Sequence, residues 1–425
     1  MNIFDQLLAD NQIPKFVRVR HEMDRGHIDD IEGAVAQAMQ REGTLDRIKP
    51  GDSVCITAGS RDVANIARVI RAICDQVKSV GAHPFIIPAM GSHAGAKAEG
   101  QRGIIEGYGV TEEAMGAPIR ATMDTEVIAH SKSGLEIHLD KYANAADFLI
   151  PVGRIKAHTD FRGEVESGIC KMLVIGMGKQ HGAYQCHKLG FKSMAANVKE
   201  FAGAIIEKKP NMFAIGLIEN AYHQTCRIEA IPAGRILEEE PPLLEYAKSR
   251  MAKVPFDQAD ILFVDETGKD ISGAGMDPNV TGRSPVLGIS RPFFQRIAVF
   301  DLTDKSHGNF GGLGSADVTT QRLYRKIDFE QTYPNGITAA EPLAVRLPVI
   351  MPSDRTAMQF ALRTATDCDW SKGPRIVWLK NTLSLSEFYI SEALIPDAEA
   401  LDNVTIVSEP MEVIFDEEGN VKELR

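Results

Sequence analysis

The chain has 425 residues and carries 58 acidic against 47 basic side chains, which gives a formal net charge of −11. This length exceeds what one hydrophobic core usually organises, so two domains are expected. The acidic balance excludes a general nucleic-acid-binding face, because phosphate neutralisation requires an excess of lysine and arginine. No apolar run approaches a membrane span, and six dispersed cysteines without a CxxC motif indicate free thiols in a cytoplasmic protein.

The apolar pattern of the first half predicts alternating helices and strands. Helices are expected over residues 28–48 and 63–80, and buried strands at 52–58, 84–89, 146–152 and 211–218. Apolar strands that alternate with amphipathic helices are typical of parallel sheets covered by helices. In such sheets, ligands bind beyond the carboxyl ends of the strands.

A charged, proline-containing stretch separates this half from a second series of strands. Residues 241–258 are predicted to form a linker helix between an N-terminal α/β domain, residues 1–240, and a C-terminal α/β domain, residues 259–425. Strands of the second domain are expected to begin at Ala259 and to cover 296–304, 347–352 and 375–381. We expect mainly parallel sheets in both domains, with the active-site cleft between them and the second domain closing over the substrate.

Two predicted strand ends in the first domain carry candidate binding residues. His93 follows the strand 84–89 in the loop GSHAG, whose glycines permit close backbone approach to a ligand. The alternative is a histidine that simply caps the next helix. Ser60 and Arg61 follow the strand 52–58, where backbone amides and a guanidinium would suit an anion. The alternative for this turn is a plain helix cap by Asp62.

The glycine-rich segment after the strand 146–152 concentrates further candidates. His158 lies in a locally basic loop, which favours an anionic substrate, the alternative being a solvated loop. Lys171 lies among small and apolar residues, where a desolvated amine becomes a nucleophile, the alternative being a lysine that extends to solvent. His181 and His187 could each bind a soft metal, and their spacing does not choose between them.

In the second domain, a long polar loop follows the first predicted strand. Residues 265–283 are rich in glycine and contain Lys269, Asp277, Asn279 and Arg283. A loop of this length and polarity at a strand end is typical of a substrate or phosphate clamp, and the alternative is a surface excursion.

Several of these motifs recur together in one known family. The triplet GSH ends at His93, and a strand-G-x-x-x-x-H element ends at His158. The sequence SGICK ends at Lys171, Gly176 follows five residues later, and His187 follows sixteen residues after the lysine. In these motifs and spacings the chain resembles the nickel-pincer cofactor-dependent lactate racemase family of 2-hydroxyacid racemases and epimerases.

The resemblance implies an isomerase that inverts the C2 stereocentre of a 2-hydroxy acid or sugar acid, with one histidine as acid or base for each face. The implied cofactor is the nickel-pincer nucleotide (pyridinium-3-thioamide-5-thiocarboxylic acid mononucleotide nickel), which partner biosynthetic enzymes must supply. The implied roles are acid/base catalysis for His93 and His158, covalent attachment for Lys171, cofactor contact for Ser60, Arg61 and Gly176, nickel binding for His187, and substrate contact for Lys269, Asp277, Asn279 and Arg283.

The sequence departs from the family pattern near the implied substrate. Thr281, Gly282 and Arg283 replace an aromatic–glutamine pair and a nearby lysine, and Gly-Ser-Arg-Asp replaces an Asp-x-Thr-Arg-Pro turn. The cofactor is therefore better supported than lactate as substrate. Two other classes of protein stay open as alternatives: a lyase or isomerase that uses a simple divalent ion, and a non-catalytic hydroxy-acid-binding protein. The exact substrate and the oligomeric state are open too.

Overall fold

The structure, a computed structural model, describes residues 3–60, 63–284, 286, 289, 291–339 and 341–425. The chain forms two compact units, which we call the central unit, Asp24–Met251, and the terminal unit, Met1–Met23 with Ala252–Arg425. Both are mixed α/β units with helices packed on sheets, as expected. The boundaries differ from those predicted, because the N-terminal strand β1 (Phe16–His21) pairs with β15 (Glu387–Ser391) and β16 (Val404–Ile406) of the terminal unit.

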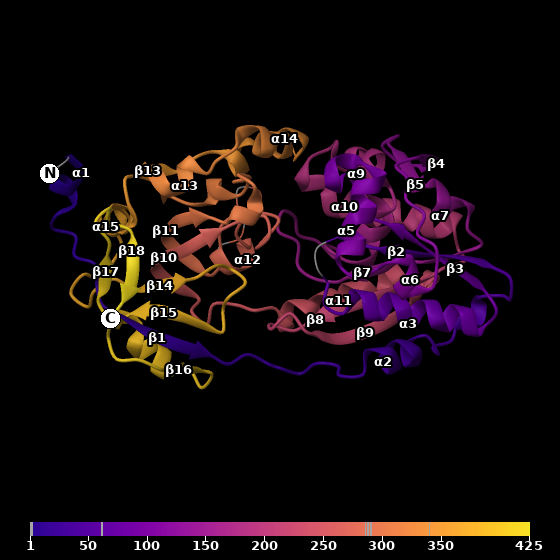
Figure 1. The fold of residues 1–425 in the computed structure, drawn as a ribbon, viewed down its shortest axis with the longest axis horizontal. Coiled ribbons are helices and arrows are strands. Elements are labelled where there is room, and N and C mark those ends of the chain that lie inside the picture. Colours follow the sequence, from indigo (N-terminus) through magenta and orange to yellow (C-terminus); the bar gives the residue numbers. More distant parts are fainter. Residues whose placement is uncertain (1–2, 61–62, 285, 287–288, 290, 340) are drawn as a thin grey trace. The chain divides into compact units, whose positions relative to one another are not determined.

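The central unit contains a short parallel sheet in the order β3-β2-β6 (Figure 1). The strands β2 (Ser53–Ala58), β3 (His83–Pro88) and β6 (Phe148–Ile150) fall on three of the predicted apolar runs. Between β2 and β3, the helix α3 (Ile66–Ser79) buries one apolar face in the same core. Because β2 and β3 are parallel neighbours, the loops that carry Ser60 and His93 both follow the carboxyl ends of the strands, on the same side of the sheet.

The strand predicted at 146–152 is divided at Pro151 into two strands of different sheets. β6 belongs to the parallel sheet, whereas β7 (Val152–Arg154) pairs in parallel with β8 (Phe213–Glu219). β8 in turn pairs antiparallel with β9 (Thr225–Pro232). Proline has no N–H to donate, so Pro151 suits the point at which the chain leaves one ladder for another. The loop that carries His158 follows β7.

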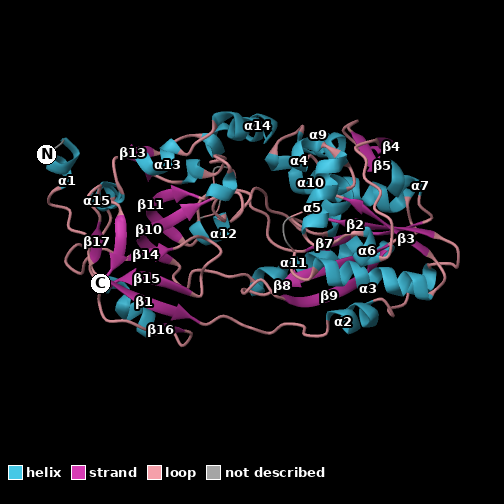
Figure 2. Ribbon diagram, viewed as in Figure 1, coloured by secondary structure: helices cyan, strands magenta, loops and turns pink. Residues whose placement is uncertain are grey.

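The remaining elements of the central unit complete its core (Figure 2). They are α2 (Ile31–Ala38), α4 (His93–Ala96), α5 (Ala98–Gly107), α6 (Glu112–Met115), β4 (Thr125–His130), β5 (Glu136–Asp140), α7 (Lys141–Ala145), α8 (Ile169–Lys171), α9 (Lys179–His187), α10 (Phe191–Lys208) and α11 (Ile236–Arg250). The helix predicted at 241–258 is present as α11 as far as Arg250, but it is not a linker between the units. This helix packs Leu243, Leu244 and Ala247 into the core of the central unit.

The terminal unit is built on an eight-stranded sheet in the order β13-β12-β11-β10-β14-β15-β1-β16. The parallel strands are β10 (Gln258–Thr267), β11 (Phe293–Leu302), β12 (Val318–Thr320), β13 (Val349–Met351) and β14 (Ile376–Leu379). The strands predicted for the second domain are therefore confirmed. The chain proceeds from β10 through β11 and β12 to β13 on one side and returns to β14 on the other side of β10 (Figure 1). The strand order thus reverses between β10 and β14.

Helices and a hairpin cover this sheet. The helix α15 (Asp354–Thr364) packs Ala357, Met358 and Ala361 against a sheet face that includes Phe263 and Trp378. The other elements of the terminal unit are α1 (Ile3–Leu8), α12 (Pro278–Thr281), α13 (Gln321–Arg325), α14 (Phe329–Ala339), α16 (Ile395–Glu399) and the antiparallel strands β17 (Val413–Phe415) and β18 (Val421–Leu424).

Candidate active site

His93 lies at the start of α4, five residues after β3. Its Nδ1 lies 2.6 Å from the hydroxyl oxygen of Ser60, which comes from the neighbouring loop after β2. The fully buried Gln101 donates its side-chain amide to the carbonyl oxygens of Gly91 (2.7 Å) and His93 (3.3 Å). Ala94 has a φ of 54°, a left-handed conformation that costs energy for a non-glycine residue and is concentrated at functional turns. The backbone of this histidine is therefore fixed by buried contacts.

His158 lies in the loop after β7, and its side chain is 12% exposed. Its backbone N–H donates to Glu166 (2.7 Å), a carboxylate with no exposed side-chain surface. The ring stacks on Phe161 at a centroid distance of 4.2 Å. The backbone N–H of Asp160 donates to Nδ1 of the ring at 2.9 Å. These contacts fix both the ring plane and the nitrogen that carries a proton, since a neutral imidazole that accepts at Nδ1 is protonated at Nε2.

Lys171 meets His158 directly. The lysine ends α8, and its Nζ lies 2.5 Å from Nε2 of His158. The contact joins the amine and the imidazole in one half-buried place, and which nitrogen donates depends on the tautomer of the ring. Amines and imidazoles are the groups that serve as nucleophiles and as acid/base groups in enzymes.

The chain after Lys171 continues as a π-helix, Met172–Gly176, that packs against the His93 loop. The amide of Gly91 donates to the carbonyl oxygen of Gly176 at 3.4 Å. A Cβ on Gly176 would lie 3.0 Å from the carbonyl oxygen of Ala89 and 2.6 Å from Sδ of Met172. Only glycine permits this approach, so Gly176 holds the His93 loop beside the lysine segment. Single-turn π segments are frequent at functional sites.

His187 ends α9, and its Nδ1 donates to the carbonyl oxygen of Ala183 at 2.6 Å. This bond leaves the lone pair at Nε2, which is the atom that a metal-binding histidine uses when its other nitrogen is held by a carbonyl. Burial lowers the pKa of His187, and the nearby Lys171 acts in the same direction. The neutral ring is therefore favoured at neutral pH. His181 is exposed and stacks on His138 at 5.5 Å, so His187 is the better placed of the two predicted metal ligands.

Two cations of the locally basic loop around His158 are paired with carboxylates of the central unit. Arg154 forms an ion pair with Glu219 at 2.7 Å. Arg162 lies 3.3 Å from Glu166 and also donates to the carbonyl oxygen of His158. The positive charge of this loop thus serves its own folding.

In the terminal unit, the predicted substrate residues mostly bond to their own loop. Asp277 caps α12 and accepts from the backbone (2.9 Å) and side-chain (2.7 Å) amides of Asn279. Lys269 donates to the carbonyl oxygen of Gly273 at 2.6 Å. Arg283 forms an ion pair with Asp317 at 2.5 Å and donates to three backbone carbonyl oxygens, those of Ser315, Phe294 and Gln295. Arg61, predicted to contact the cofactor, lies outside the described residues.

Comparison with known proteins adds evidence about the fold. No family model and no curated protein sequence matches the chain. Among solved structures, the chain is similar to the lactate racemase apoprotein from Thermoanaerobacterium thermosaccharolyticum. The match has a TM-score of 0.53 at 16% sequence identity, and it covers 86% of this chain and 93% of that chain. The likeness extends over both units and shows a shared fold.

Sequence reasoning missed three buried groups that support this site. Lys179, whose side chain is completely buried, lies 3.1 Å from the equally buried carboxylate of Asp140. Glu240 accepts from the backbone N–H of Cys170 at 2.8 Å, and burial raises the pKa of this carboxyl. Glu166, described above, is the third. Lys179 had a sequence signal, a lysine between glycines, but Glu240 lies 70 positions from Cys170 and had none.

Two negative findings concern the described part of the chain. None of its helices is both long enough and apolar enough to cross a membrane. Within the same residues, no group of three or more histidine, cysteine, aspartate or glutamate side chains is gathered as a metal site. A single imidazole such as that of His187 would therefore need further ligands from a bound group.

Proposed function

We propose that this chain is an isomerase that inverts the configuration at C2 of a 2-hydroxy acid or sugar acid, using a nickel-pincer nucleotide attached to Lys171. The observation that carries the proposal is the contact of Lys171 Nζ with His158 Nε2 at 2.5 Å. It joins a nucleophilic amine and an acid/base group in one half-buried site. The fold likeness to a lactate racemase apoprotein supports the same class of reaction.

The residues present fit the proposed cofactor. The amine of Lys171 suits covalent attachment, and Nε2 of His187 has a lone pair for nickel. Ser60 contacts His93, and Gly176 packs against the loop of His93, and both would contact the cofactor. When bound, the pincer supplies a reversible hydride acceptor, which no amino-acid side chain provides.

The protein's own contribution is proton transfer and positioning. His93 and His158 each remove or return the proton of the substrate hydroxyl, one for each enantiomer. Ser60 orients His93 through Nδ1, while Asp160 and Phe161 orient His158. The substrate is proposed to be a small anion, with Lys269, Asp277, Asn279 and Arg283 as the predicted contacts. Enzymes that make the cofactor are required partners.

Peptide mass spectrometry across Lys171 tests the proposal. The protein is coproduced with the nickel-pincer biosynthetic enzymes, and the expected result is a nucleotide-sized, nickel-containing adduct on the peptide with Lys171. Lys171→Ala should lose the adduct, whereas Lys188→Ala, at a neighbouring lysine, should keep it. An unmodified peptide, with a control racemase modified in the same cells, overturns the proposal. Activity restored by a divalent ion alone would then favour a simple metal-dependent lyase or isomerase, and binding without turnover would favour a hydroxy-acid-binding protein.

A further inference from the structure

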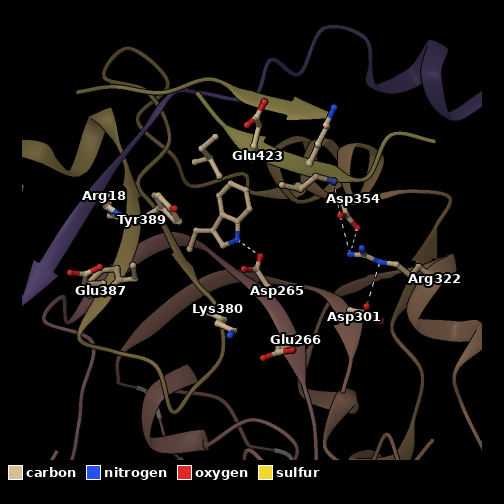
Figure 3. Close-up of a pocket in the computed structure, with 15 residues that line it drawn as sticks. Arg18, Asp265, Glu266, Asp301, Arg322, Asp354, Lys380, Glu387, Tyr389 and Glu423 are labelled. Atoms are coloured by element: carbon tan, nitrogen blue, oxygen red, sulfur yellow. Dashed lines mark hydrogen bonds and ion pairs between the residues drawn. The ribbon is translucent and has the colours of Figure 1, made fainter. Parts of the chain in front are cut away.

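The terminal unit contains a cavity of about 720 Å³ that none of the predicted site residues lines. Figure 3 shows it bounded by side chains from β10, β14, β15 and β1, with residues of β18 on the opposite side. A volume in this range is typical of sites for small organic molecules. The cavity lies within a single unit, so all of its walls are defined by one compact body.

Its position in the sheet is one that favours ligand binding. Asp265 and Glu266 lie near the carboxyl end of β10, and Trp378 and Lys380 lie at the carboxyl end of β14. The strand order reverses between these two strands. In open α/β sheets, ligands bind outside the carboxyl ends of the strands at such a reversal, because the connecting loops diverge there.

The floor of the cavity is a row of side chains across adjacent strands. Trp378 lies opposite Tyr389 in the register of β14 and β15, and Tyr389 lies opposite Arg18 in that of β15 and β1. Side chains at paired positions project from the same face of a sheet. Asp265 completes the row, since it accepts from Nε1 of Trp378 at 2.6 Å. Trp378 is only 2% exposed, so the floor presents mainly Tyr389, with the Arg18 guanidinium at one end and the Asp265 carboxyl at the other (Figure 3).

The carboxylates of the lining are largely matched by partners of the chain itself. Asp354 is bound by Arg322, with two contacts of 3.0 Å, and by the backbone N–H of Val421. The other partners are Lys326 for Asp301, Arg20 for Glu387, Arg425 for Glu423 and the side-chain amide of Asn381 for Glu266. Burial also raises the pKa of Asp265 to about 7 and that of Asp354 to about 6, which diminishes their negative charge.

Apart from Arg322, the cations of the lining are not matched in this way. Arg18, Lys380 and Lys422 come from β1, from the end of β14 and from β18. Within the described residues, none of the three side chains forms an ion pair. Three segments far apart in the sequence therefore bring uncompensated positive charge to one cavity. A chain with a net charge of −11 gathers these cations against its overall balance.

We propose that this cavity binds a small organic polyanion that carries carboxylate or phosphate groups, held by Arg18, Lys380 and Lys422. The site shares no residue with the cluster around Lys171 and does not depend on the proposed isomerase activity. Its ligand interacts with the cations through charge-assisted hydrogen bonds, and its carbon skeleton lies on Tyr389, above the buried Trp378.

The cavity contains its own optical reporter. The chain has two tryptophans, and Trp370 is 51% exposed, so Trp370→Phe leaves Trp378 as the single fluorophore. Titration of this variant with citrate and, separately, with pyrophosphate should give a saturable change in fluorescence. Citrate and pyrophosphate distinguish a polycarboxylate from a phosphate ligand. Isothermal titration calorimetry with the same probes gives an independent reading of binding.

Substitutions locate the binding. In the Trp370→Phe background, Arg18→Gln, Lys380→Gln and Lys422→Gln should each weaken binding roughly tenfold, the effect of one charge-assisted hydrogen bond. Lys372→Gln is the matched control, because Lys372 is an exposed lysine of the same unit that pairs with Asp369 away from the cavity. An equal loss of affinity in Lys372→Gln would indicate non-specific electrostatic attraction and overturn the proposal. Absence of saturable binding by both methods, or saturable binding of spermidine in place of the anions, would overturn it as well.

Discussion

The carboxyl ends of parallel strands carry polar side chains in both units, but the two units use them differently. In the central unit, Ser60 contacts His93 and Lys171 contacts His158, so reactive groups from distant segments meet one another. In the terminal unit, Asp277 caps its own helix and Arg283 binds backbone carbonyls. Polar residues that follow strands of an α/β sheet can therefore contact one another across segments or bond to the surrounding backbone. Which occurs depends on whether the polar atoms are already satisfied by the backbone.

The difference is also seen within one segment of the central unit. Lys171 is half-buried beside an imidazole, whereas Lys179, eight residues later, is fully buried against a carboxylate. The ammonium group of Lys179 is engaged by Asp140 and by the carbonyl oxygen of Pro88. We therefore expect substitution of Lys171 to affect activity and substitution of Lys179 to affect stability.

The largest effect is expected from His158→Gln in the cofactor-loaded protein. Loss of a general acid/base should slow racemisation by roughly 10²–10⁴-fold. The rate is measured as the loss of optical rotation of a 2-hydroxy acid that the unsubstituted protein racemises. His130→Gln, at an exposed histidine of the same unit, is the control and should leave the rate unchanged. A His158→Gln protein within a few-fold of full activity would remove His158 from the site.

Lys179→Met should lower the free energy of unfolding by about 3–5 kcal/mol, because it leaves the buried Asp140 carboxylate without a cationic partner. Burial already raises the pKa of Asp140, so the uncompensated charge is costly. Lys171→Met should change stability little. Urea unfolding followed by circular dichroism measures both. The double variant Lys179→Met/Asp140→Asn should recover part of the loss, and failure to recover would show that the pair is not the cause.

Asp265→Asn should make stability less dependent on pH. The pKa of this carboxyl is raised from 3.8 to about 7, chiefly by burial, with Asp354 and Glu266 adding to the shift and Trp378 and Arg322 opposing it. A raised carboxyl pKa means that the folded state holds a proton which the unfolded state releases, so stability falls as the pH rises from about 4 to 7. Across this pH window, the free energy of unfolding of Asp265→Asn should rise by up to about 4 kcal/mol relative to that of the unsubstituted protein, since one unit of pKa shift corresponds to about 1.36 kcal/mol. Denaturation at pH 4 and pH 8 measures the difference, and a constant offset would contradict it.

The sequence predicted the elements of the fold better than their connections. Apolar runs located β2, β3, β8, β10, β11 and β14, because buried parallel strands are recognisable without knowledge of their neighbours. The pairing of β1 with β15 joins residues more than 350 positions apart, and the division at Pro151 is a change from one sheet to another. No local pattern encodes either feature. The histidines and Lys171 were predicted as site residues from motif and spacing. Glu166 and Glu240 were not, since a buried carboxylate looks like a surface one in sequence.

The smallest effect is expected from Arg283→Ala, and it separates the two interpretations of the terminal loop. The guanidinium stabilises the fold through Asp317 and three carbonyl oxygens, so its removal should lower the free energy of unfolding by roughly 2 kcal/mol. If this structural role is its only one, the KM of the cofactor-loaded protein for its substrate should not change. A substrate contact predicts the reverse, a KM raised at least tenfold with stability nearly intact. Arg296→Ala is the matched control for a partly buried arginine that also binds backbone carbonyls in this unit. Parallel measurement of unfolding and KM in the two variants decides whether a strand-end arginine serves the fold or the ligand.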